Sequence, residues 1–292
     1  NALSFSPVDQ VREILRYQNI ELLELNLSQI GEIPDDVDGV AMIAPAYDLT
    51  ESESDALVRY WSRPRSALFF LLDDGPVPPR LRALLRQNGV TPRGDRVVSR
   101  EGGRLITRAR GVFTDGMPFL GGLTGLSTEF NGAISSLEVR EGAEDLLVRS
   151  IQPFGLIEAV PGFWGESDSE ISDASYDEVE DHGSPLHLAA AVIRGVESDD
   201  RFAADSSRMF VMSGVDFLSP DQARAENLDM LASAANWLIA REELAGIGPR
   251  SLFTYKLPLL DAHISFINRL NLVFLPAIFV LTGAIVWSFR RH

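Results

Sequence analysis

The feature that most constrains this chain is an uncharged, mainly apolar run near its C-terminus, residues 270–289. A helix rises about 1.5 Å per residue, so a run of roughly 20 residues matches the hydrocarbon core of a bilayer, which is about 30 Å thick. Arg269 precedes the run, and Arg290 and Arg291 follow it. This pattern predicts one transmembrane helix over residues 269–290 and leaves a buried C-terminal core helix as the alternative.

The residues before this run have the composition of a folded domain. We expect an extracytoplasmic α/β domain over residues 1–250 and a juxtamembrane linker over residues 251–268. The positive-inside rule places Arg290 and Arg291 in the cytoplasm. The predicted topology is therefore a single C-terminal span with the large domain outside the cytoplasm.

Composition excludes several classes of function. The formal net charge is −16, and the chain contains no cysteine. A surface that binds nucleic acid needs clustered lysine and arginine, so we expect no nucleic-acid partner. Disulfides, thiolate metal sites and a cysteine nucleophile are excluded. No P-loop and no G-x-S-x-G elbow occur, and we expect no cofactor.

The first part of the chain alternates helical and strand patterns. Thr50 is followed three residues later by Glu53, which predicts a capping box at a helix start. This alternation predicts a doubly wound, mostly parallel sheet. In chain order the expected elements are a helix at 7–18, strands at 20–27 and 38–46, a helix at 49–61, a strand at 66–75 and a helix at 78–89.

The second part of the chain is less regular. The glycine-rich residues 101–135 predict loops with short strands. Further strands are expected at 144–151, 184–195 and 207–220, before a helix at 227–243. The residues expected to face inward from that helix are Leu228, Leu231, Ala235 and Leu238.

An acidic segment, residues 166–181, carries eight carboxylates and no basic residue. Such a segment repels itself, so a solvated loop is the simplest interpretation. A calcium site is the alternative, although the glycine and the terminal glutamate of an EF-hand loop are missing. His182 and His187 are five residues apart, which fits a helical zinc site poorly and favours surface or edge-strand histidines.

Three carboxylates follow predicted strands: Asp73 and Asp74 after one, and Asp216 after another. Doubly wound sheets bind ligands at the carboxyl ends of their strands, so these residues mark a candidate crevice for a ligand or a partner. Two carboxylates in different environments can also serve as acid and base, which leaves a membrane-tethered hydrolase as an alternative. Acidic residues that only end strands and cap helices are the simpler interpretation.

Two stretches together resemble the gliding-motility ABC-transporter auxiliary family (GldG-like). Residues 33–75 run from an acidic turn through an apolar strand, a proline and a capped helix to a buried strand ending in aspartate. Residues 208–243 are similar to that family's later strand, its Gly-x-Asp-Phe turn and a helix ending in Asn-Trp-Leu. Where the family usually has a glycine pair, this chain has Arg63, Pro64 and Arg65.

The resemblance implies a flavodoxin-like or glutamine-amidotransferase-like domain without catalytic residues, held on the periplasmic side of the bacterial cytoplasmic (inner) membrane by the single C-terminal span. It also implies a non-catalytic auxiliary subunit of an ABC-2 type transporter, which binds a substrate, an envelope protein or a small ligand beside an ABC permease subunit and a separate ATPase subunit. A structural or receptor-like ectodomain is the remaining alternative. Within the predicted span, the face expected to pack against the permease consists of Gly283, Ala284, Trp287 and Ser288.

Overall fold

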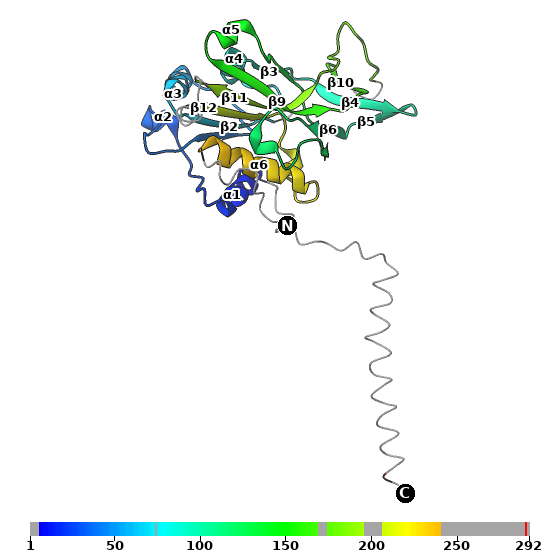
Figure 1. Ribbon diagram of the computed structural model, residues 1–292, viewed down its shortest axis with the longest axis horizontal. Coiled ribbons are helices and arrows are strands. Elements are labelled where there is room, and N and C mark those ends of the chain that lie inside the picture. The colour runs from blue at the N-terminus through cyan, green and yellow to red at the C-terminus, as the bar shows by residue number, and fades with distance from the viewer. Residues whose placement is uncertain (1–5, 74, 169–173, 196–205, 241–289, 291–292) are drawn as a thin grey trace. The chain divides into compact units, whose positions relative to one another are not determined.

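The computed structural model describes residues 6–73, 75–168, 174–195, 206–240 and 290. Contacts between residues divide the chain into two units, Asn1–Arg250 and Ser251–His292. All the helices and strands named below belong to the first unit (Figure 1).

The lengths of the described helices test the predicted location in a membrane. In the described ranges, no helix is both long enough and apolar enough to cross a bilayer. The longest, α6 (Ala225–Leu238), has 14 residues and spans only about 21 Å at 1.5 Å per residue. The prediction of a protein held in the bacterial cytoplasmic membrane by a single C-terminal span is corrected by this finding. The residues predicted for that span, 269–290, lie outside the described residues except for Arg290.

Nine strands of the described chain form a mixed sheet. Its main path runs β1-β2-β12-β11-β9-β6-β7, while β8 pairs with β11 and β3 pairs with β8. The strands β1, β2 and β12 are parallel, and every other pairing in this sheet is antiparallel. The strands are β1 (Val40–Ile43), β2 (Ala67–Leu71), β3 (Val90–Pro92), β6 (Ala109–Phe113), β7 (Ser127–Phe130), β8 (Leu137–Val139), β9 (Ile151–Ala159), β11 (His187–Arg194) and β12 (Ser207–Met212).

The predicted flavodoxin-like or glutamine-amidotransferase-like, doubly wound and mostly parallel sheet is therefore wrong. Its alternation of strand and helix holds for β1, α3 (Glu51–Ser62) and β2, but the middle of the chain adds antiparallel strands. β11 lies between two antiparallel neighbours, β12 and β9, and is largely buried. A strand covered on both faces is apolar whichever way its neighbours run, so its residues do not reveal strand direction.

Helices cover both faces of the main sheet, as Figure 1 shows. On one face lie α1 (Pro7–Tyr17) and α6, and on the other lie α3 and α4 (Pro79–Gln87). These four helices confirm the helices predicted from the apolar periodicity. The described residues also form two short helices, α2 (Leu27–Ile30) and α5 (Glu144–Leu147), and two 3-10 turns, η1 (Pro118–Leu120) and η4 (Asp216–Leu218).

The side chains of β2 and β12 pack into a hydrophobic cluster on each face of the sheet. Phe69 and Phe210 stack with ring centroids 5.2 Å apart and belong to the cluster that includes α1 and α6. Phe70 and Val211 belong to the cluster that includes α3 and α4. Full burial of such a side chain stabilises the fold by about 1.5–3 kcal/mol, so these two strands contribute much of the core energy.

Two predicted strands are not strands in the structure. Residues 20–26 form no strand, because Ile20 and Leu22 pack with the α1–α6 cluster whereas Leu27 packs with the α3–α4 cluster. This segment therefore passes from one face of the sheet to the other instead of pairing along it. Residues 144–150 form α5 and a turn, and the strand β9 begins only at Ile151.

The capping box at the start of α3 is confirmed. The backbone N–H of Glu53 donates to Thr50 Oγ1 over 3.3 Å, and the backbone N–H of Thr50 donates to Glu53 Oε2 over 2.8 Å. The hydroxyl of Ser28 also donates to Glu53. The bond from Ser28, followed by those from Thr50, lowers the pKa of Glu53 below 4.5. Because this carboxylate is favoured in the folded state, its contribution is present at neutral pH and is lost as the pH falls through the lowered pKa.

Replacement of Thr50 by alanine removes the acceptor for one otherwise unpaired helix N–H. We expect Thr50→Ala to lower the free energy of unfolding by about 1 kcal/mol, measured by urea denaturation. Arg59→Ala, on the exposed side of the same helix, is the matched control and should change it by less than about 0.5 kcal/mol. Equal effects from the two variants would contradict a capping role for Thr50.

A second, three-stranded sheet is fastened to the first by a buried carboxylate. This sheet has the order β10-β4-β5 and consists of β4 (Arg96–Glu101), β5 (Arg104–Ile106) and β10 (Phe163–Glu166). Asp95 precedes β4, and its Oδ1 accepts from the backbone N–H of Ser136 over 2.6 Å. Its Oδ2 accepts from Ser136 Oγ over 2.6 Å and lies 3.0 Å from His182 Nδ1.

Removal of this carboxylate should loosen the junction between the sheets. We expect Asp95→Ala to lower the free energy of unfolding by about 3 kcal/mol, because it leaves buried donors without acceptors. The exposed Asp115 provides a control, and Asp115→Ala should change stability by less than about 0.5 kcal/mol. A loss below 1 kcal/mol for Asp95→Ala would show that the sheets are held together by other contacts.

Candidate binding pocket

Two of the carboxylates predicted to form a crevice, Asp73 and Asp216, do not line the same cavity among those found in the described residues. Asp73 is exposed and lines a cavity of about 40 Å³ at the carboxyl ends of the strands, formed mainly by the loop from Leu72 to Pro78. Asp216 does not line this cavity. Its Oδ2 accepts from the backbone N–H of Ala133 over 3.2 Å, so this carboxylate fastens one loop to another. Asp74 lies outside the described residues.

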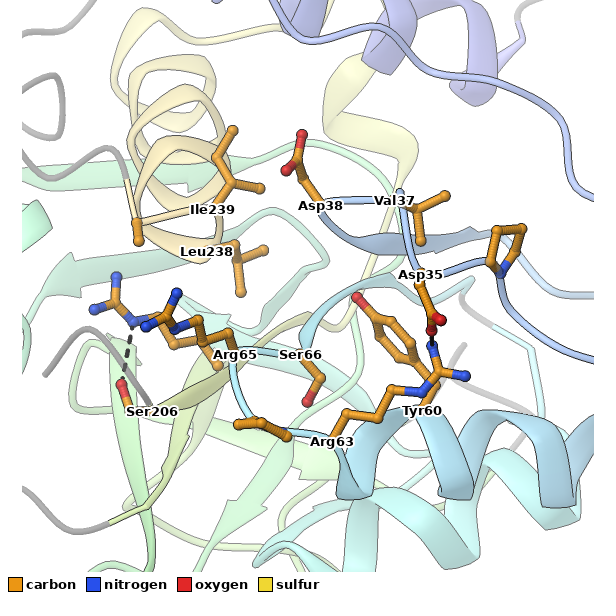
Figure 2. Close-up of a pocket in the computed structure, with 14 residues that line it drawn as sticks. Asp35, Val37, Asp38, Tyr60, Arg63, Arg65, Ser66, Ser206, Leu238 and Ile239 are labelled. Atoms are coloured by element: carbon orange, nitrogen blue, oxygen red, sulfur yellow. Dashed lines mark hydrogen bonds and ion pairs between the residues drawn. The ribbon is translucent and has the colours of Figure 1, made fainter. Parts of the chain in front are cut away.

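A larger cavity, of about 460 Å³, lies at the opposite end of the parallel strands. The chain enters β1, β2 and β12 there, and α3 and α6 end there (Figure 2). This volume falls within the usual range for small-ligand sites, about 300–1,000 Å³. The lining residues are Pro34, Asp35, Val37, Asp38, Tyr60, Arg63, Pro64, Arg65, Ser66, Ser206, Arg208, Leu238, Ile239 and Ala240.

The turn from α3 into β2 forms one wall of this pocket. Arg65 has a φ of +59°, in the left-handed region that glycine adopts most easily. The guanidinium of Arg194 donates to the carbonyl oxygens of Trp61 and Arg63, the latter over 2.9 Å. Ser207 Oγ also donates to the Arg63 carbonyl, over 2.9 Å. These bonds hold the turn that the chain makes without a glycine pair.

The second wall is built on Arg208, near the start of β12. This side chain is only 4% exposed, and its Nη1 donates to the carbonyl oxygen of Trp237 over 2.5 Å. The guanidinium also lies over the Trp237 ring, 5.4 Å from the centroid. Trp237 is in the last turn of α6, where carbonyl groups lack helical partners and a cation is favourable. Arg208 therefore caps the C-terminal end of α6 and also lines the pocket.

Tyr60 and an ion pair complete the polar lining. The hydroxyl of Tyr60 accepts from the backbone N–H of Ala67 over 3.3 Å, and burial raises the pKa of Tyr60 above 10.0. Arg63 Nη1 lies 2.7 Å from Asp35 Oδ1 and donates to the carbonyl of Ile33 over 3.1 Å. Tyr60 is thus a neutral hydrogen-bonding group at neutral pH, and Arg63 and Asp35 largely neutralise each other.

Sequence reasoning did not identify this pocket. The chain offers no short motif for it, because its residues come from five separate segments of the chain. One signal was present: the Arg63-Pro64-Arg65 triplet departs from the glycine pair of the resembling family and lies at the pocket wall. The predicted permease-packing residues Gly283, Ala284, Trp287 and Ser288 lie outside the described residues.

The other candidate residues are placed away from this pocket. His187 begins β11, its ring lies over Gly155, and burial lowers the pKa of His187 below 6.5. Within the acidic segment, Glu166 ends β10 and is buried, and Asp181 Oδ1 accepts from the backbone N–H of Ser167 over 3.1 Å. In the part of the chain that the structure describes, no group of three or more His, Asp or Glu side chains could hold a metal ion.

Comparison with solved structures finds a similar fold. The "mmIFT52 N-terminal domain" matches with a TM-score of 0.52 and 12% sequence identity, covering 81% of this chain and 93% of that chain. At this identity the likeness shows the fold alone. Models of protein families and curated proteins give no match.

Two substitutions at one position test the backbone of the pocket wall. Arg65→Gly and Arg65→Val both remove the guanidinium, but only valine must be forced into the left-handed region. We therefore expect Arg65→Val to be less stable than Arg65→Gly by about 1 kcal/mol or more in urea denaturation. If the two variants unfold at the same urea concentration, the turn does not require this conformation.

Proposed function

We propose that this chain is a non-catalytic binding subunit of an ABC-2 type transporter. It would act beside an ABC permease subunit and a separate ATPase subunit, and its folded domain would bind a substrate or another protein of the complex. The observation that carries the proposal is the ordered resemblance of residues 33–75 and 208–243 to the GldG-like auxiliary family.

The arrangement of these two stretches supports the proposal. Although they are far apart in the sequence, they supply the three parallel strands β1, β2 and β12 and the helices α3 and α6. They therefore pack together as one continuous part of the domain. A resemblance carried by residues that form one structural unit is stronger than the same matches scattered over separate parts of a fold.

The pocket also supports a binding role. Both stretches contribute to its lining, through Pro34 to Ser66 in one and Arg208 to Ala240 in the other. Several of its polar side chains are fixed by hydrogen bonds to backbone groups, as described for Arg208 and Tyr60. A site whose groups are already held in place loses little conformational entropy when a ligand binds.

Co-purification from cells that produce the chain naturally tests this function. We expect a tagged full-length chain, cross-linked before extraction and identified by mass spectrometry, to recover one ABC permease and one ATPase in constant ratio. The same extraction from cells with an untagged chain is the control. Recovery of the tagged chain without either partner would contradict the proposal.

A further inference from the structure

The 460 Å³ pocket has charged groups of opposite sign on opposite sides. Asp38, in the segment before β1, and Arg65, on the turn before β2, both line the pocket and are well separated in Figure 2. Leu238 lies between them in the same view. This separation of charge differs from the Arg63–Asp35 pair at the edge, in which the two charges are in direct contact at 2.7 Å.

The acidic side is suited to a cation. Among the described residues, none forms a hydrogen bond or an ion pair with the Asp38 carboxylate. Figure 2 places Asp38 beside Ile239, the C-cap residue of α6. The end of a helix carries partial negative charge, so a carboxylate beside it favours a positively charged group in the space between them.

The basic side is suited to an oxyanion. Arg65 and Arg208 both line it, together with the hydroxyl-bearing Ser206. Arg208 Nε lies 3.5 Å from Ser206 Oγ. A guanidinium has five N–H donors, so each arginine can keep its protein contacts and still donate to a carboxylate.

The surface between the two sides is apolar. Val37, Leu238 and Ile239 contribute to it, and Leu238 is also part of the core cluster that contains α6. A ligand that matches all three surfaces carries an ammonium group, a carboxylate group and an apolar side chain.

We propose that this pocket binds a small zwitterion of the amino-acid class, with the ammonium group at Asp38 and the carboxylate at Arg65 and Arg208. The proposal deepens the proposed function, because it rests on the binding role of the domain and names the class of ligand. It does not depend on which permease the chain accompanies.

Titration calorimetry on the purified full-length chain tests this inference. We expect L-leucine to bind at one site per chain with a dissociation constant below about 1 mM. L-Leucinamide lacks the carboxylate charge and 4-methylpentanoate lacks the ammonium group, so each should bind at least about tenfold more weakly. Failure of L-leucine to bind at about 10 mM, or equal binding of 4-methylpentanoate, would overturn the proposal.

Matched variants locate the site. Asp38→Asn and Arg65→Gln should each weaken the binding of L-leucine at least about tenfold, with thermal unfolding used to confirm that both remain folded. Asp36→Asn and Arg59→Gln change exposed residues outside the pocket and should bind as the unchanged chain does. Unchanged affinity in Asp38→Asn would overturn the assignment of the ammonium group.

The result is separable from that of the co-purification. If L-leucine fails to bind while an ABC permease and an ATPase are recovered with the chain, the ligand class is wrong and the subunit function stands. If L-leucine binds and neither partner is recovered, the pocket is a ligand site in a protein with another role.

Discussion

The structure depends on the position of β12, which joins a parallel part of the sheet to an antiparallel part. On one side it runs parallel to β2, and on the other it runs antiparallel to β11. All six of its residues are buried, and the side chains of Met209 to Met212 alternate between the two core clusters. β12 is followed in the chain by η4 and α6, so its position in the sheet also determines where these two elements lie. The pocket lies at the beginning of this strand and the loop fastened by Asp216 lies beyond its end.

At the pocket end of the parallel strands, arginine side chains donate hydrogen bonds to backbone carbonyl groups at the ends of helices. Arg194 donates to Trp61 at the end of α3, and Arg208 donates to Trp237 at the end of α6. Each guanidinium also lies over the indole ring of the same tryptophan. Burial lowers the pKa of Arg194, but an arginine side chain remains charged at neutral pH. In a chain with a formal net charge of −16, these cations therefore have structural roles that surface charge does not reveal.

Local signals in the sequence predicted local structure well. The capping box at Thr50 and the apolar stripe at residues 7–18 gave the correct helices, because both depend on neighbours within a few residues. The direction of β11 and the crossing path of residues 20–26 depend on distant partners, so periodicity did not show them. The strands before Asp73 and Asp216, β2 and β12, are parallel neighbours, but the contact of Asp216 with Ala133 comes from a distant segment that periodicity does not show. The pocket formed by Asp38, Arg65 and Arg208 exists only after remote segments have packed together.

We infer that ligands bind at the amino ends of the parallel strands and not at their carboxyl ends. A crystal structure of the chain grown with L-leucine tests it most directly. We expect electron density for the amino acid between Asp38 and Arg65, with its side chain against Leu238. Density beside Asp73 at the other end of the strands, or an empty pocket in crystals saturated with L-leucine, would contradict it.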